Sequence, residues 1–292
     1  MDLESFGIKA EIGNSRHERL KNGDKKACEE FAQKIFDKAG IKGELEGSEA
    51  CARVLNEAEF SAFTADDEKM LELADEMFSK LEEVGEPFSE FEKAVVRYGI
   101  VFADIGKTGP VGTSPEDQRN LMEMFNVEGL PTGQITVEEF IETYIAPEKK
   151  EACRKTLLKI GFPPPDKTTM TDFWNAHGKW MWEILKNDSL IPKEFTPGAI
   201  FHQILERVNE DLLDGERLKG DFGGNDKFDR AEMLVILIDK YNACHNRSKI
   251  PHSKTIEILK IQVAKSAYAG NEKFLHLINL LDEVGDSASF ER

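Results

Sequence analysis

The sequence DFGGNDKFDRAE at residues 221–232 decides the expected fold. Its oxygen-bearing side chains are spread along the stretch, and an acid, Glu232, stands at its end. Glycine, Asn and Asp favour turns, whereas the apolar residues that follow, up to Tyr241, favour a helix. The stretch therefore predicts a loop that leads directly into a helix.

The end of this stretch repeats elsewhere in the chain. A loop of about a dozen residues with glycine near its middle precedes a single apolar residue, and an acid four positions later opens a helix. The apolar residue and the acid are Leu45 and Glu49, Phe88 and Glu92, Ile135 and Glu139, and Phe228 and Glu232.

This repeat resembles the EF-hand, a helix, a 12-residue calcium loop and a second helix. The long linkers and degenerate loops are similar to those of sarcoplasmic calcium-binding proteins and calexcitin-like proteins. The resemblance covers residues 27–175 and a further unit at 210–240, although no loop matches D-x-[DN]-x-[DN]-G through to Glu in full. It implies an all-α fold of multiple EF-hand-like helix-loop-helix units and a calcium-binding buffer or sensor.

Calcium takes six to eight oxygens, which an EF-hand supplies from loop positions 1, 3, 5, 7, 9 and 12. In residues 221–232, Gly223 offers no side-chain oxygen at position 3, and Asp226 stands at position 6, where glycine makes the turn. The predicted Ca²⁺ ligands are the side chains of Asp221, Asn225, Asp229 and Glu232, with the carbonyl of Lys227.

The other loops have fewer ligands. In residues 128–139, Leu130 stands at position 3, and the weaker candidate ligands are Glu128, Thr132, Gln134 and Glu139. The loops that end at Glu49 and Glu92 favour an EF-hand shape that has lost its metal. Residues 188–199 and 162–173 resemble the pattern faintly and are predicted to be structural.

Helical spacing of apolar residues predicts helices along the whole chain, and no alternating β-branched segment predicts a strand. Three prolines at 163–165 mark either a boundary between two lobes, residues 1–160 and 161–292, or a rigid loop inside one domain. The expected helices cover residues 27–38, 66–83, 88–98, 115–125, 137–144, 147–160, 173–185, 197–213, 230–241, 253–269 and 271–284.

Composition excludes several classes of protein. The 55 acidic and 38 basic side chains give a net charge of −17, which repels nucleic acid and attracts cations. No run of 18 apolar residues could span a membrane, and no secretory pattern opens the chain, so we expect a cytoplasmic protein. The four cysteines lack zinc or disulfide spacing.

No catalytic motif is present, so the sequence predicts a protein that is not an enzyme. The six histidines show no HExxH pairing, and GKTG at 106–109 lacks the spacing of a phosphate loop. The aromatic group at 173–182 indicates either core packing or a pocket for an apolar ligand or partner helix. The alternative to calcium binding is therefore a metal-free helical scaffold of EF-hand shape that binds a protein or a small apolar ligand.

Overall fold

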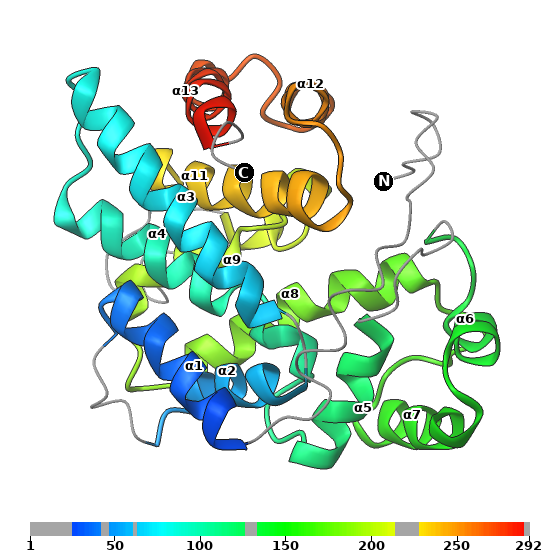
Figure 1. The fold of residues 1–292 in the computed structure, drawn as a ribbon. Helices are drawn as coiled ribbons and strands as arrows, with labels where there is room; N and C mark the ends of the chain where they lie inside the picture. The colour runs from blue at the N-terminus through cyan, green and yellow to red at the C-terminus, as the bar shows by residue number, and fades with distance from the viewer. Residues whose placement is uncertain (1–24, 42–46, 61–62, 126–132, 214–227, 289–292) are drawn as a thin grey trace.

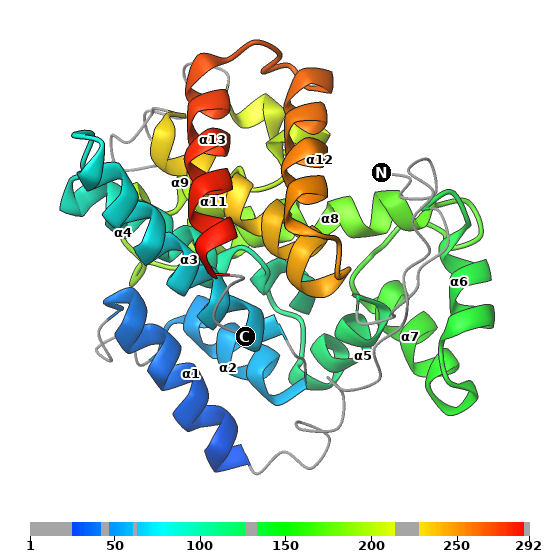
Figure 2. The ribbon, with the colours of Figure 1, turned by 45° about the horizontal axis from the view of Figure 1, so that its top comes forward.

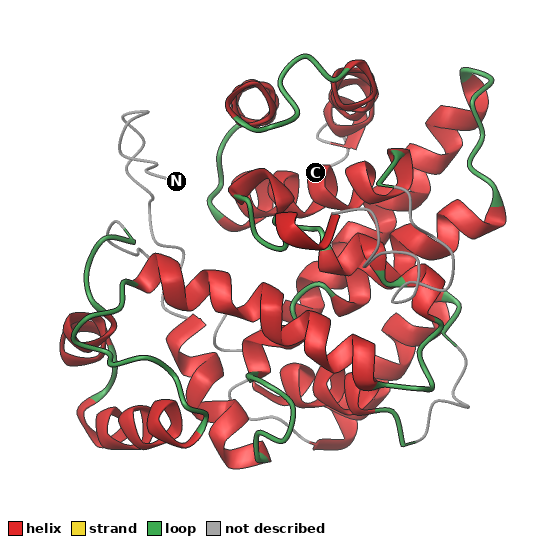
Figure 3. Cartoon of the chain, turned by 180° about the vertical axis from the view of Figure 1, so that it is seen from behind, coloured by secondary structure: helices red, strands yellow, loops and turns green. Residues whose placement is uncertain are grey.

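The computed structural model describes residues 25–41, 47–60, 63–125, 133–213 and 228–288. Within these ranges the fold is all-α, as predicted, and the only β pairing is an isolated antiparallel bridge between Thr136 and Thr169 (Figures 1 and 3). None of the described helices combines the length and apolar character needed to cross a membrane.

Helices make up most of the described residues. In chain order they are α1 (Lys25–Ala39), α2 (Glu49–Phe60), α3 (Phe63–Glu83), α4 (Glu90–Phe102), α5 (Pro115–Phe125), α6 (Val137–Tyr144), α7 (Pro147–Lys159), α8 (Met170–Asn187), α9 (Pro197–Ile200), α11 (Arg230–Tyr241), α12 (His252–Lys265) and α13 (Glu272–Ala288). Shorter 3₁₀ turns lie at Ile105–Thr108 (η3), Lys193–Phe195 (η4), Ile204–Glu206 (η5) and Glu210–Leu213 (η6), and a π-helical turn, η7 (Asn242–Arg247), extends α11.

The larger hydrophobic core is built around α11. Every residue from Ala231 to Ile238 is buried, so this helix is apolar on all sides and needs neighbours all around it. It packs against α3, α4, α9, α12 and α13, and Figure 2 shows α12 and α13 lying side by side over it. The core also takes in buried residues of α1 and α2.

A second, smaller core lies among α5, α6, α7 and the first turns of α8. Helix α8 joins the two cores, since its Met170 and Phe173 belong to the smaller one and its Met181 and Ile184 to the larger one (Figure 1). The cores thus divide the chain into residues 121–173 and the segments on either side of them, whereas the predicted division at 160 and 161 stays a prediction.

The aromatic group at 173–182 packs into these cores. Phe173 is fully buried and makes edge contacts with Phe162 and Trp180. Trp174 packs against the smaller core and Trp182 against the larger one. Of the two predicted roles, the structure supports core packing.

The prediction of a helix at 197–213 was wrong. The structure has only one α-helical turn there, α9, followed by 3₁₀ turns. Arg207 and Asn209 adopt left-handed backbone conformations with φ of 64° and 61°, which no α-helix accommodates. The Asn209 side chain donates to the carbonyls of Gly178 and Ile200, so contacts distant in sequence hold this break in place.

Candidate functional site

Two of the five predicted ligands at 221–232 can be located. Asp221, Asn225 and Lys227 lie outside the described residues. Asp229 is the N-cap of α11, where its side chain accepts from the Arg230 N–H at 2.8 Å. Glu232 accepts from the backbone N–H of Asp229 at 3.0 Å and is only 2% exposed. These two acids therefore form a capping box, which satisfies N–H groups that the first turn of a helix leaves without partners.

The weaker loop shows the same arrangement. Glu128 and Thr132 lie outside the described residues, and Gln134 is exposed. Glu139 accepts from the N–H and the hydroxyl of Thr136 at 2.8 and 3.0 Å, and Thr136 caps α6 in return. These hydrogen bonds lower the pKa of the Glu139 carboxyl.

Capping boxes also open α4 and α8. Ser89 pairs with Glu92, and Thr169 pairs with Asp172. The acid that stands four positions after an apolar residue is thus the third helical residue of a capping box in α4, α6 and α11, and α8 has the same box after Thr168. The helix that opens at Glu49 differs, because Asp188 from the end of α8 accepts the Ala50 N–H at 3.0 Å.

The loop pair α5–α6 and α7–α8, called here the bridged pair, is joined through backbone. The Val137 N–H donates to the Thr168 carbonyl at 2.8 Å, and the Met170 N–H donates to the Ile135 carbonyl at 3.0 Å. These two bonds flank the isolated bridge between Thr136 and Thr169. Two helix–loop–helix units therefore meet at the residues that cap their second helices.

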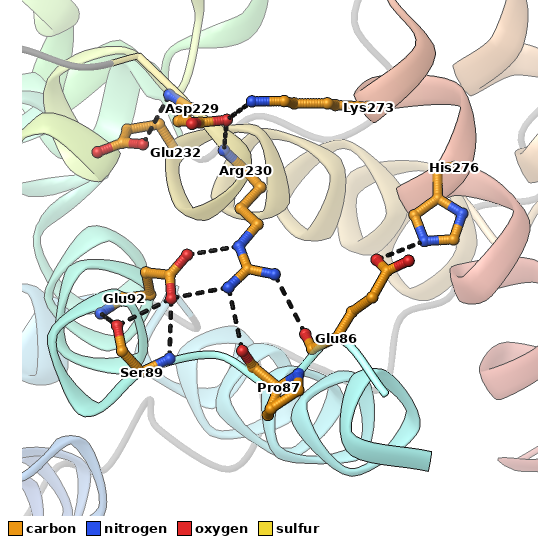
Figure 4. Close-up of polar contacts among 9 residues, drawn as sticks. All are labelled: Glu86, Pro87, Ser89, Glu92, Asp229, Arg230, Glu232, Lys273 and His276. Carbon is orange, nitrogen blue, oxygen red and sulfur yellow. Dashed lines mark hydrogen bonds and ion pairs between the residues drawn. The ribbon is translucent and has the colours of Figure 1, made fainter. Parts of the chain in front are cut away.

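The α3–α4 connection and the start of α11, called here the arginine-linked pair, are joined through a side chain (Figure 4). The Arg230 guanidinium donates from Nε to one Glu92 oxygen at 2.5 Å and from Nη2 to the other at 2.9 Å. It also donates to the carbonyls of Glu86 and Pro87 at 3.1 and 3.0 Å and lies over the Phe88 ring. One arginine thus binds the carboxylate and two backbone carbonyls of the facing connection.

The electrostatics of this link are those of a charged pair. Burial pushes the pKa of Glu92 upward, but hydrogen bonds from Arg230 and Ser89 outweigh it and hold that pKa below its usual value. The hydrogen bond from Arg230 to Glu92 also raises the pKa of the guanidinium. Both groups are charged at neutral pH, so the link is a bidentate, charge-assisted pair.

A hollow of about 460 Å³ lies beside Arg230, between the end of α3 and α13. Its other basic residues are also paired with acids: Lys273 binds Asp229, and His276 Nε2 lies 3.0 Å from Glu86 (Figure 4). The walls between these pairs are apolar, with Leu81 and Leu277 among them. The hollow is therefore a seam between elements whose polar side chains are already paired.

A second group of ionisable residues is buried between the two cores. His177 of α8 and His202, just after α9, bring their Nε2 atoms to 3.2 Å. Asp104, the N-cap of η3, places a carboxylate oxygen within 4.8 Å of a nitrogen of each ring. Lys107 forms an ion pair with Asp104 at 2.5 Å, and its charge helps hold the pKa of that carboxyl below its usual value, against the effect of burial.

Burial dominates the protonation of the two histidines. It lowers the pKa of His177 to about 3 and also lowers the pKa of His202. Both rings are therefore neutral at physiological pH. A buried pair of neutral imidazoles beside a carboxylate is a set of atoms that can hold a transition metal.

The sequence did not indicate this group, because the six histidines show no metal-ligand spacing. The three residues come from separate elements and share no local motif, since His177 and His202 are 25 positions apart. Only the tertiary packing of α8 on η3 and α9 brings them together.

Comparison with known proteins gives no family for the chain. No protein-family model, curated protein or solved structure matches it.

Proposed function

We propose that this chain is a calcium-independent helical scaffold of EF-hand shape that binds a protein partner. The observation that carries the proposal is the bidentate contact between Arg230 and Glu92. Glu92 stands at the position where an EF-hand loop places its bidentate calcium ligand. A guanidinium that engages both of its oxygens takes the place of a cation there.

The remaining loop carboxylates support the same proposal. Glu139, Asp172 and Glu232 are each engaged in the capping box of their own helix. To bind calcium, each would have to leave backbone N–H groups that its helix end leaves otherwise unpaired.

In the α7–α8 connection the carbonyls are engaged as well. The Pro164 carbonyl accepts from Lys167 and Thr168, and the Pro165 carbonyl accepts from Glu138. Carbonyl oxygens are the ligands that a loop poor in acids would need for calcium. This connection is therefore built from contacts within the protein.

The net charge indicates the kind of partner. At −17 the surface attracts a basic protein segment and steers its approach, and this attraction weakens as salt rises. Calcium binding at residues 221–232, with Asp221, Asn225, Lys227, Asp229 and Glu232 as ligands, is the rival function.

The test is calorimetry of chelator-treated protein with Ca²⁺, together with thermal denaturation in chelator and in millimolar Ca²⁺. A scaffold should give no heat of binding and the same unfolding temperature in both conditions. Saturable heat with thermal stabilisation would contradict it and support the rival function.

Two matched variants separate specific coordination from general attraction of cations by an acidic surface. Asp221→Asn removes the predicted first ligand, and Asp226→Asn makes the same change at position 6, which is not a ligand position. If calcium binds as the rival function requires, only Asp221→Asn abolishes the heat. Equal, small effects of both changes would indicate non-specific attraction and leave the scaffold as the better account.

A further inference from the structure

The hydrogen bonds of the two buried histidines determine which ring nitrogen carries the proton. His202 Nδ1 lies 2.6 Å from the Ala199 carbonyl oxygen, and His177 Nδ1 contacts the Trp174 carbonyl oxygen. A carbonyl oxygen can only accept a hydrogen bond, so each Nδ1 must donate. In a neutral imidazole the other nitrogen, Nε2, then carries an unshared electron pair.

These electron pairs face each other. The two Nε2 atoms are 3.2 Å apart in a buried setting, with His177 3% and His202 1% exposed. Two acceptors at this distance repel unless a positive centre lies between them, and at low dielectric that repulsion is not screened by water. The centre is either a shared proton or a metal ion.

The spacing matches a metal ion. Two nitrogens bound to tetrahedral Zn²⁺ at about 2.0–2.1 Å are separated by about 3.3 Å. A carboxylate oxygen of Asp104 completes a group of three ligand atoms that all lie within 4.8 Å of one another. A ring that donates from Nδ1 to a backbone carbonyl is also the usual way in which proteins orient a histidine ligand.

We infer that Asp104, His177 and His202 form a buried binding site for a divalent transition metal of the zinc class. Two imidazoles and one carboxylate suit Zn²⁺ and disfavour Ca²⁺, which takes oxygen ligands. The Lys107 ammonium, which is paired with Asp104, orients that carboxylate from outside the ligand set.

A neighbouring oxygen supports a fourth ligand. Gln203 follows His202, and its Oε1 is buried without a hydrogen-bond partner among the described residues. This oxygen faces α8 next to His177, since a Cβ placed on Gly178 would lie 3.4 Å from it. It can accept from a water bound at the fourth position of the metal, which would complete a tetrahedron of two nitrogens and two oxygens.

The three ligands come from the N-cap of η3, from α8 and from the segment after α9. Because α8 also belongs to the smaller core, a metal here would hold that core to the larger one. This role goes beyond the proposed function, which concerns calcium and the loop carboxylates, and either inference can fail without the other.

The test is calorimetry of chelator-treated full-length protein with Zn²⁺, and optical absorption with Co²⁺ as a spectroscopic substitute. The expected results are one ion per chain and the intense visible bands of four-coordinate Co²⁺ with nitrogen and oxygen ligands. His177→Gln and His202→Gln should each weaken Zn²⁺ binding by more than about 100-fold. This loss exceeds the one expected from changing a residue that only hydrogen-bonds to a ligand. His276→Gln, the same change at an exposed histidine on α13, should leave binding unchanged.

Absence of Zn²⁺ binding by the wild-type protein at micromolar free metal would overturn the inference and favour the shared proton. Equal loss in His276→Gln would overturn it as well, because the ion would then be bound at the surface. If His177→Gln and His202→Gln do not fold, the Co²⁺ spectrum of the wild-type protein decides whether the site exists. Weak bands of six-coordinate Co²⁺, or charge transfer from cysteine thiolate, would contradict a site built from these three residues.

Discussion

The arginine-linked pair and the bridged pair begin their helices in the same way but are held together differently. The capping boxes of the first pair are Ser89 with Glu92 and Asp229 with Glu232, and those of the second are Thr136 with Glu139 and Thr169 with Asp172. Across the first pair a guanidinium binds a carboxylate and two carbonyls, whereas across the second two backbone hydrogen bonds flank a β-bridge. The start of each helix is thus decided by local sequence, and the link between units by tertiary contacts.

This difference has a physical consequence. Backbone hydrogen bonds depend neither on the identity of one side chain nor on its ionisation. The link through Arg230 depends on both, since Glu92 must be charged and the planar fork of arginine must be present. The two pairs should therefore respond differently to substitution and to pH.

The largest effect is expected where the two cores meet. A Cβ on Gly106 of η3 would lie 1.9 Å from the His177 carbonyl oxygen of α8, so Gly106→Ala must push these elements apart. We expect a loss of about 3 kcal/mol in the free energy of unfolding, measured by urea denaturation. Gly270→Ala is the control, because its φ of 75° is strained for alanine but nothing lies within 4 Å of the added Cβ.

The control should lose only about 1 kcal/mol. If Gly106→Ala and Gly270→Ala are equally destabilising, close packing between η3 and α8 does not unite the two cores. A single cooperative transition in the wild-type protein, followed at two wavelengths, would support one folding unit.

The arginine link is expected to contribute the next largest effect. Arg230→Gln removes the charged hydrogen bonds to Glu92 and should cost about 2 kcal/mol. Arg154→Gln is the matched change in the bridged pair, where Arg154 binds the more exposed Glu138 and Glu142 of the neighbouring α6. It should cost less than about 1 kcal/mol, as exposed ion pairs do.

Urea denaturation of both variants measures the difference, and Arg230→Lys sharpens it. Lysine keeps the charge but not the fork, so it should recover only part of the stability. Full recovery by lysine would mean that charge alone links the pair. Equal losses in Arg230→Gln and Arg154→Gln would remove the distinction between the two pairs.

The capping boxes should be equivalent in both pairs. Ser89→Ala, Thr136→Ala and Thr169→Ala each remove one capping oxygen and should cost about 1 kcal/mol. For a chain of this size that loss lowers the unfolding temperature by about 2 °C in a calorimetric scan. Serine at positions 136 and 169 should restore the cap, and a much larger loss at one box would show that it also links its unit to a neighbour.

The same distinction explains what the sequence could predict. Helices α5, α6 and α11 were predicted with their observed bounds, because Pro115, Thr136 and Asp229 mark their starts through purely local chemistry. The prediction of a helix at 197–213 was wrong because Asn209, whose backbone is left-handed, donates hydrogen bonds to carbonyls of α8 and α9. Helix propensity depends on residues close in sequence and cannot indicate such contacts.

The candidate sites follow the same rule. Glu92 and Glu232 were recognised as special positions, and their role in capping boxes follows from the same local spacing. The pairing of Arg230 with Glu92 joins residues 138 positions apart, and no pattern in either segment indicates it. No pattern indicates that His177 and His202 face each other either, since this arrangement depends on the end of the helix after α9.

The smallest expected effect is the pH dependence of the arginine link. The pKa of Glu92 is lower in the folded protein than its ordinary value of 4.5, so its contribution to stability is complete above that value. The contribution is lost as pH falls below 4.5 and through the lower folded pKa. Because Glu92 is partly exposed, solvent screening limits this to about 0.5 kcal/mol.

A double-mutant cycle can isolate a term of this size. The free energy of unfolding, measured with urea, should decrease less below pH 5 in Glu92→Gln than in the wild-type protein. The same substitution should make a smaller difference when Arg230→Gln is already present. Glu139→Gln is the matched change in the bridged pair, where the carboxyl pKa is lowered by Thr136 alone. Its effect should be the same with or without Arg230, because nothing couples the two. If Arg230→Gln changed the effects of the Glu92 and Glu139 substitutions equally, the guanidinium would act through the net charge of the protein rather than through its contact with Glu92.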